Sequence, residues 1–247
     1  EDEGEEDNTY LSYNMVVGEA ADINLSLAFE VLDYALLSAP GAPLKQALLD
    51  AKIGKDIYGS FEDGIKQTYF SIVAKGANLN QKEEFIKVIR DTLTKIAEEG
   101  IDKKAVTAGI NYYEFRFREA DFSSYPKGLM YGLDILSSWL YDDTKPFCEV
   151  QLLEGFEFLK KALEEGYFEE LIRKYLLDNT HGAILSLVPE KGLAAKRDKE
   201  LEVKLENYRK SLSDEELTRM VEHTKALEAY QEAEEAPEAL TCIPMLS

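Results

Sequence analysis

Apart from carboxylates, the side chains that most often do chemistry are scarce in this sequence of 247 residues. It contains two histidines, His181 and His223, and two cysteines, Cys148 and Cys242, against 48 aspartates and glutamates. A helical zinc hydrolase site needs two imidazoles one turn apart together with an acidic partner. The histidines lie 42 positions apart and neither has another histidine nearby, so the spacing predicts no metal site.

Both histidines stand in settings typical of structural roles. His181 lies close to Asn179 at the start of a predicted strand, where capping of a turn is expected, and His223 follows Glu222 on a charged helix face. Neither cysteine has a neighbouring histidine, and the Gly-x-Ser-x-Gly, phosphate-loop and Gly-x-Gly-x-x-Gly patterns do not occur. We therefore predict no catalytic and no metal-binding residue in this chain, while its substrate-binding residues stay unknown from sequence.

Two cysteines 94 positions apart indicate a reducing compartment or no selection for disulfides, with a structural bridge between Cys148 and Cys242 as the alternative. No segment approaches the roughly 20 apolar residues that a membrane helix needs, so we expect no membrane-spanning segment. We expect a cytoplasmic location, with an organelle matrix as the alternative.

The charge balance excludes one class of partner. Against the 48 acidic residues stand 28 lysines and arginines, and the formal net charge of −20 would repel a phosphate backbone, so no nucleic-acid partner is expected. With so many carboxylates, any proposed catalytic pair carries little information, and most should lie on solvated helix faces. The 45% of apolar residues nevertheless suffices for a large folded core.

Two segments could have a more specific role. Residues 112–118 alternate aromatic and basic side chains, as in surfaces that stack bases, but Tyr113 and Phe117 share one helix face. That pattern favours core packing flanked by solvated arginines. Residues 18–22 precede a long helix whose N-terminus could bind an anion, but Glu19 would repel one, so we expect no anion site there.

Hydrophobic periodicity predicts an α+β fold, mainly an antiparallel sheet with helices packed on one face, followed by a charged helical hairpin. Strands are predicted at residues 10–17, 57–61, 66–74 and 181–189, and the middle two form a hairpin. Helices are predicted at residues 22–38, 43–51, 80–99, 102–118, 128–140, 150–164 and 167–177.

Two helices carry further information. The helix at residues 22–38 is apolar on nearly every face, so it should be buried on several sides and offer no polar side to a cleft. Asn80 and Glu83 have the spacing of a capping box for the helix that Gly100 ends, and Asp102 is the expected cap of the next one.

The composition changes after residue 189, where large apolar residues become sparse. A second capping box, Ser213 with Glu216, separates two charged helices, each with a narrow apolar seam. Such a seam cannot stabilise a helical hairpin alone, so it should lie against the main domain or an absent neighbour.

These changes predict four parts. Residues 1–8 are an acidic, disordered lead, residues 9–190 an α+β domain and residues 191–236 a helical-hairpin linker. Residues 237–247 are mostly apolar and follow an acidic break, so we expect them to begin a connection to an absent domain of a longer polypeptide. A C-terminal edge strand docked on this domain is the alternative.

Six segments of the sequence can be compared with a known family: residues 38–44, 53–56, 117–122, 125–129, 139–142 and 179–182. Taken in this order, they resemble the presequence-protease branch of the pitrilysin (insulinase-like) zinc metallopeptidases. The resemblance extends from about residue 10 to residue 247. It implies a parent enzyme of four related α+β domains, two in each half, joined by a helical-hairpin linker and closing around unfolded peptides.

The resemblance also implies where zinc chemistry would lie. The first domain of such an enzyme carries a His-x-x-Glu-His motif that binds zinc, whereas the corresponding helix here, residues 22–38, contains no histidine. The chain therefore resembles the zinc-free second domain followed by the start of the linker. No family ligand or catalytic base can be transferred to a position in this sequence.

This resemblance predicts a non-catalytic structural domain, forming chamber wall and hinge, of a larger zinc metallopeptidase that degrades unfolded peptides. The chain alone should be inactive and need no cofactor, with zinc in the parent enzyme. Its expected partners are the remaining domains of the same polypeptide and peptide substrates. The alternative is an independent acidic module that binds basic peptides or proteins.

Overall fold

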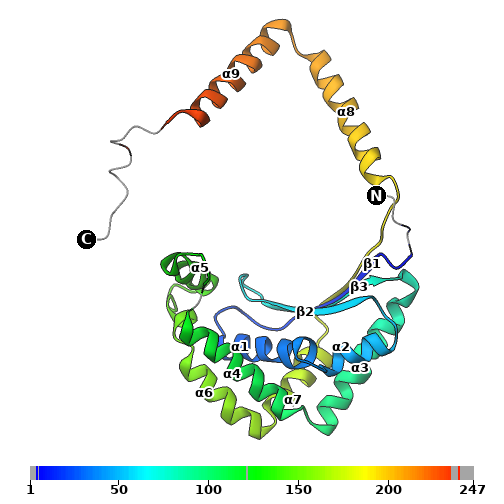
Figure 1. Cartoon of the computed structure of the whole chain (residues 1–247), viewed down its shortest axis with the longest axis vertical. Helices are drawn as coiled ribbons and strands as arrows, with labels where there is room; N and C mark the ends of the chain where they lie inside the picture. The colour runs from blue at the N-terminus through cyan, green and yellow to red at the C-terminus, as the bar shows by residue number, and fades with distance from the viewer. Residues whose placement is uncertain (1–3, 5, 121, 235–238, 240–247) are drawn as a thin grey trace. The chain divides into compact units, whose positions relative to one another are not determined.

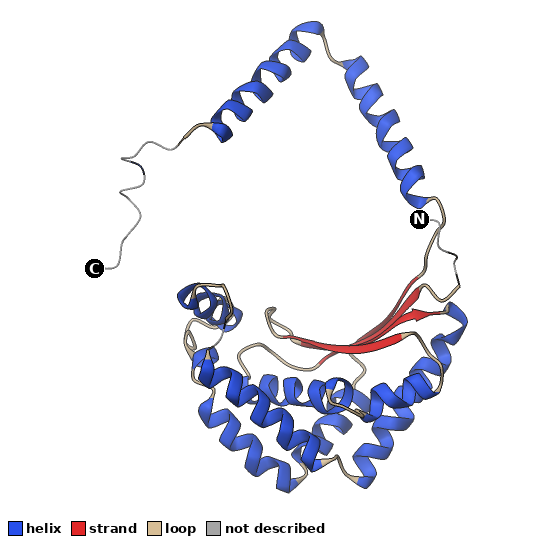
Figure 2. Ribbon diagram, viewed as in Figure 1, coloured by secondary structure: helices blue, strands red, loops and turns tan. Residues whose placement is uncertain are grey.

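The apolar strands predicted from the sequence form one four-stranded antiparallel sheet in the order β2-β3-β1-β4. The computed structural model describes residues 4, 6–120, 122–234 and 239 (Figure 1). Helices of residues 2–190 lie on one face of the sheet (Figure 2), which confirms the predicted α+β fold. The strands are β1 (Thr9–Val16), β2 (Asp56–Glu62), β3 (Tyr69–Ala77) and β4 (Gly182–Leu187).

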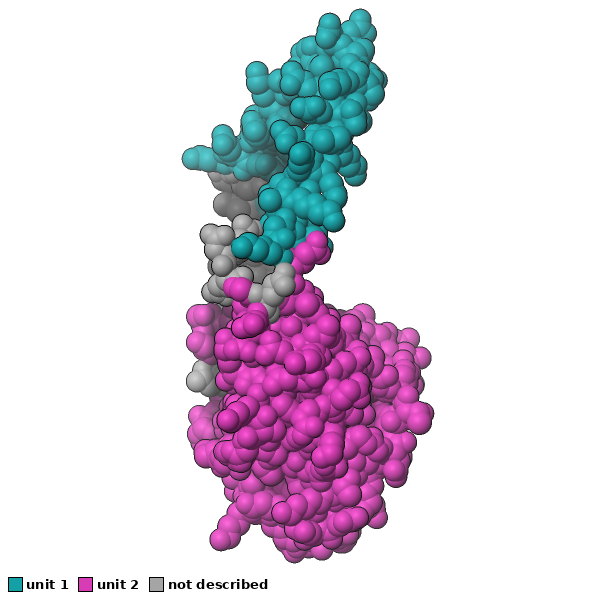
Figure 3. Space-filling view, turned by 90° about the vertical axis from the view of Figure 1, so that its right-hand side faces the viewer, with its two compact units in different colours: residues 1, 191–247 teal, residues 2–190 magenta. Residues whose placement is uncertain are grey.

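The chain divides into two compact units, residues 2–190 and residues 191–247 with residue 1 (Figure 3). The α-helices of the larger unit are α1 (Ile23–Asp33), α2 (Pro43–Asp50), α3 (Lys82–Glu99), α4 (Lys103–Glu119), α5 (Lys127–Trp139), α6 (Leu153–Ala162) and α7 (Tyr167–Leu171). Short 3₁₀ or π turns are η1 (Tyr34–Ser38), η2 (Leu79–Gln81), η3 (Cys148–Val150), η4 (Leu163–Glu165) and η5 (Ile172–Leu177).

The two faces of the sheet differ in chemistry because side chains alternate along each strand. Leu11, Met15 and Ile72 are fully buried against the helices. On the opposite face, Asn14 Oδ1 accepts hydrogen bonds from Ser12 Oγ at 2.9 Å and from Ser71 Oγ at 2.6 Å. This network satisfies small polar side chains across the two central strands.

Helix α1 is the most enclosed element of the larger unit. The ring of Phe29 lies 5.7 Å from the ring of Phe61 and 5.8 Å from that of Phe70, which belong to β2 and β3. On other sides, Gly109 of α4 and Gly155 of α6 admit side chains of α1 and the turn after it, because a Cβ at either position would crowd them. Burial on several sides is therefore confirmed for this helix.

Two boundaries predicted from the sequence are wrong. The capping box before α3 is formed by Asn78, whose backbone amide donates to Gln81 Oε1 at 2.9 Å, and not by Asn80 with Glu83. The turn η2 precedes the α-helix and moves the cap upstream. Strand β3 begins at Tyr69 instead of Lys66, because the backbone of residues 66–68 hydrogen-bonds to residues 17–20 and not to β2.

Other local predictions are confirmed. The Asp102 side chain accepts from the amides of Lys104 and Ala105 at the start of α4. Gly100 follows α3 with φ +99°, in the positive-φ region that glycine adopts at little cost.

The smaller unit contains two charged helices, α8 (Leu193–Ser211) and α9 (Asp214–Glu232). The Ser213–Glu216 capping box is confirmed, since Glu216 N donates to Ser213 Oγ at 3.2 Å and Ser213 N to Glu216 Oε2 at 2.8 Å. Neither helix contains a buried residue. The apolar side chains expected to form a seam are exposed at Leu201, Leu205, Tyr208, Val221 and Leu227.

Some predictions fall on residues that the structure does not describe. Cys242 lies outside the described residues, so the alternative of a bridge to Cys148 stays untested, as does the role of residues 240–247. Among the described residues, no helix is both long and apolar enough to cross a membrane.

Replacing Phe29 by alanine should lower the free energy of unfolding by about 3–5 kcal/mol, because it removes a fully buried ring and leaves a cavity between α1 and the sheet. Urea unfolding followed by circular dichroism measures the loss. The matched variant Phe115→Ala, at an exposed position on α4, should change stability by no more than about 0.5 kcal/mol. Equal losses in the two variants would contradict the central position of Phe29.

Candidate functional site

A group of four carboxylates in the larger unit lines a cavity of about 270 Å³. Its four carboxylates come from four separate segments: Glu30 from α1, Asp63 from the β2–β3 connection, Asp134 from α5 and Glu149 from η3. Arg116 of α4 also lines the cavity. The remaining lining residues are Leu27, Tyr113, Phe117, Phe122, Ser137, Leu152 and Phe156.

Burial and mutual repulsion make these carboxyl groups hard to ionise. Burial, followed by the charges of Asp63 and Glu149, raises the pKa of Glu30 to about 8, although Arg116 opposes the change. Burial and the charges of Asp63 and Asp134 raise the pKa of Glu149 to about 7. Burial also raises the pKa of Asp63 and of Asp134. The cavity therefore holds part of its acid in the protonated form near neutral pH.

Glu149 is the least satisfied of the four carboxylates. Within the part of the chain that the structure describes, its Oε1 is buried without a hydrogen-bond partner. A buried polar atom left without a partner costs free energy, and the cost is smaller for a protonated carboxyl than for an ionised one. The arrangement therefore favours a neutral carboxyl group at Glu149.

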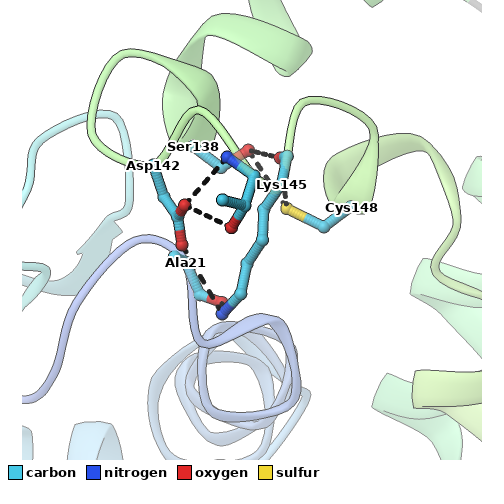
Figure 4. Close-up of polar contacts among 6 residues, drawn as sticks. Ala21, Ser138, Asp142, Lys145 and Cys148 are labelled. Atoms are coloured by element: carbon cyan, nitrogen blue, oxygen red, sulfur yellow. Dashed lines mark hydrogen bonds and ion pairs between the residues drawn. The ribbon is translucent and has the colours of Figure 1, made fainter.

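The segment that supplies Asp134 and Glu149 is fastened to the start of α1 by polar contacts (Figure 4). Lys145 Nζ donates to the carbonyl oxygen of Ala21 at 3.2 Å. Ser138 Oγ donates to the carbonyl oxygen of Lys145 at 3.3 Å, and the Cys148 thiol lies 3.1 Å from Ser138 Oγ. These contacts hold the connection between α5 and η3 and tie it to the segment before α1.

The cavity was not predicted from the sequence. The expectation that the helix at residues 22–38 offers no polar side to a cleft is wrong, since Glu30 lines the cavity. No local pattern could have found the site, because its four carboxylates are spread over residues 30–149 and meet only in the folded unit. Because the sequence contains 48 aspartates and glutamates, the few that are buried cannot be distinguished from the others by residue type.

Residues 112–118 behave largely as predicted. Tyr113 and Phe117 lie half-buried against the core, and Arg118 forms an ion pair with Glu114 at 2.6 Å. Arg116 is exposed, as expected of a solvated arginine, and it also lines the acidic cavity, 5.6 Å from the Tyr112 ring.

The turn before β4 and the segment before α1 have structural roles. Asn179 Oδ1 accepts from the His181 amide at 2.8 Å, and the carbonyl oxygen of His181 accepts from Val16 N at 3.0 Å. Asp22 caps α1 by accepting from Leu25 N at 3.2 Å, which places a further carboxylate at the helix start.

The described residues do not fit a zinc ion. Zinc sites in proteins use imidazole and thiolate ligands in tight geometry, often with a carboxylate. Among the described residues, no three histidine, cysteine, aspartate or glutamate side chains are placed to hold one metal ion. Helix α1 carries no histidine. The carboxylates of the cavity are separate acids that repel one another.

Two family models match parts of this chain. The model for the Peptidase M16 inactive domain matches residues 1–113, and the model for the associated region of M16 peptidases of group C matches residues 187–247. Both models describe parts of M16 peptidases, a family of zinc metallopeptidases, so the two ends of the chain are similar to an M16 inactive domain and to the segment associated with it. The resemblance to presequence proteases inferred from the sequence is confirmed.

Two curated relatives match nearly the whole chain. Protein HypA of Clostridium perfringens (strain 13 / Type A) is 44% identical over 239 residues, which is 97% of this chain and 24% of that protein. Presequence protease 1, chloroplastic/mitochondrial, of Arabidopsis thaliana is 34% identical over 231 residues, or 92% of this chain and 21% of that protein. The chain thus spans about a quarter of the length of these relatives.

Solved structures share the fold at low sequence identity. The inactive peptidase domain of a proposed zinc protease from Bordetella parapertussis has a TM-score of 0.58 at 12% identity, covering 75% of this chain and 94% of that one. A protease from Helicobacter pylori has a TM-score of 0.56 at 15% identity, and the match covers 73% of this chain and 41% of that one.

The acidic cavity should make stability fall as the pH rises. The pKa of Glu30 is about 8 in the folded unit and 4.5 ordinarily, so the folded state binds this proton more tightly in between. Stability is therefore highest below about pH 4.5 for this group, falls towards pH 8 and then levels off. At pH 9, Glu30→Gln should be more stable than the unchanged chain by on the order of 2 kcal/mol, with little difference at pH 5.

Urea unfolding at the two pH values measures this difference. The matched control is Glu154→Gln, at an exposed position of α6, which should follow the unchanged chain at both pH values. If the stability of the Glu30→Gln variant has the same pH dependence as that of the unchanged chain, Glu30 is not the titrating group.

Proposed function

We propose that this chain is a non-catalytic structural domain, forming part of the chamber wall and the hinge of a larger zinc metallopeptidase that degrades unfolded peptides. The observation that carries the proposal is the match to an inactive peptidase domain, together with the lack of a metal-binding group among the described residues. The relatives are about four times as long as this chain, which is long enough to contain the remaining domains of such an enzyme.

The architecture is suited to a wall. One face of the sheet is buried by helices, and the opposite face carries the hydrogen-bonded row of Ser12, Asn14 and Ser71. We propose that this face lines the chamber, because it combines short polar side chains with the exposed Leu185 and Leu187 and so can contact unfolded peptides of many sequences. The charged helices α8 and α9, with their exposed apolar residues, are proposed to form the hinge segment.

Partners and location follow from the same proposal. The partners are the remaining domains of the same polypeptide and peptide substrates, with zinc in the parent enzyme. Presequence protease relatives are named for mitochondria and chloroplasts, whereas another relative is bacterial. We propose a cytoplasmic location, with an organelle matrix as the alternative.

The net charge of −20 favours a second candidate function, an independent acidic module that binds basic peptides or proteins. In this case the chain alone should bind a lysine- and arginine-rich peptide, and binding should weaken as salt rises. Calorimetric titration at about 20 mM and about 200 mM salt tests this. An absence of binding at both ionic strengths would remove the second candidate.

The purified chain should retain less than stoichiometric zinc after dialysis and should not cleave an unfolded peptide. Zinc is measured by atomic emission, and cleavage by mass spectrometry of a basic presequence-like peptide. The complete polypeptide, expressed in the same way, is the positive control. It should retain stoichiometric zinc and cleave the peptide. Stoichiometric zinc together with peptide cleavage by the 247-residue chain would refute the proposal.

A further inference from the structure

Helix α5 places its most apolar side toward solvent. Leu129, Leu133, Leu136, Trp139 and Leu140, here named the α5 face, are between 39% and 67% exposed. The leucines are spaced by four, three and four residues, so they lie along one side of the helix. A surface helix normally buries such a stripe and exposes its polar side.

The opposite side of α5 is the polar one. Asp134 lines the acidic cavity, and Ser138 is fully buried and hydrogen-bonded to the carbonyl oxygen of Lys145. Helix α5 is therefore amphipathic, but its apolar side faces solvent and its polar side faces the protein. Its polar side is held by the larger unit, and its apolar side has no cover among the described residues.

Apolar surface continues beside the α5 face. A groove of about 620 Å³ runs along the flank of α5, and its lining includes Tyr131, Ile135, Phe147 and Leu153. Of these side chains, Phe147 and Leu153 are exposed. Contiguous apolar surface of this kind marks a protein–protein interaction site.

We propose that the α5 face docks an apolar surface of a neighbouring domain of the same polypeptide, an inference that rests on the proposed function. Permanent interfaces resemble a core cut in half, whereas transient ones keep a polar surface. Within residues 128–140, Asp134 is the only charged residue, and it lines the cavity on the other side of the helix. In a chain of net charge −20, such an uncharged stripe fits a permanent apolar partner.

The length of the relatives supports a partner in the same polypeptide. Relatives about four times as long contain further polypeptide that would be covalently linked to this domain. Covalent linkage keeps the effective concentration of a docking surface high, so the α5 face would be covered permanently. A peptide substrate or a second copy of this chain would cover it only in part of the molecules.

Cysteine labelling tests the proposal. Leu133→Cys is made in a background in which Cys148 and Cys242 are replaced by serine, both in the 247-residue chain and in the complete polypeptide that contains it. Maleimide should react rapidly with the chain and about tenfold or more slowly with the complete polypeptide. The control Lys95→Cys, at an exposed position of α3, should react equally fast in both. Leu136→Cys repeats the measurement at an independent position of the α5 face.

The other possible occupants give different results. Equal labelling of Leu133→Cys in both proteins, or a reading frame that ends at residue 247, would overturn the proposal. Protection that depends on the concentration of the 247-residue chain would assign the α5 face to a second copy, and protection that needs added peptide would assign it to substrate. Zinc content and peptide cleavage by the chain are measured separately, so failure of the proposed function can be told from failure of the docking proposal.

Discussion

The enclosure of α1 is the constraint on which the larger unit depends. Rings of β2 and β3 pack against Phe29 on one side, and the glycines of α4 and α6 let those helices approach closely on others. A helix surrounded in this way has no solvent-facing side on which to place charged residues. The two carboxylates that α1 does carry, Glu30 and Asp33, must therefore be accommodated among neighbouring elements, and burial raises the pKa of both.

The acidic cavity and the orientation of α5 are linked consequences of this constraint. Glu30 needs polar surroundings, and the side of α5 that carries Asp134 provides part of them together with Arg116. When the side of α5 that carries Asp134 faces the cavity, its leucines must face outward. The exposed apolar stripe and the acid that α5 contributes thus have one origin, the side of α5 that faces the cavity. The stripe then needs a cover from outside the larger unit.

Sequence periodicity predicted most of the fold because it reports how each segment is buried. The alternation in β1 shows which of its side chains are buried, and the apolar sequence of residues 22–38 shows that this helix is buried on several sides. The caps at Asp102 and Ser213 depend only on neighbouring residues. The boundaries that were wrong, at Asn78 and Tyr69, depend on a 3₁₀ turn and on pairing with residues 17–20, which a local pattern does not contain. The cavity needed four segments at once, so it could not be predicted from any one of them.

The enclosure of α1 is also incompatible with a zinc site of the inverted type. A zinc site of the inverted type places two imidazoles on one face of a helix, and that face must border an open cleft that admits water and peptide. Helix α1 and the turn η1 that follows it instead fill their sides with Phe29, Leu32 and Leu36, all fully buried. Exchanging such residues for histidines would leave polar rings in a closed core without the cleft they need. A zinc site of this type and a closed core are therefore alternatives for this one helix, and the apolar sequence of α1 favours the closed core.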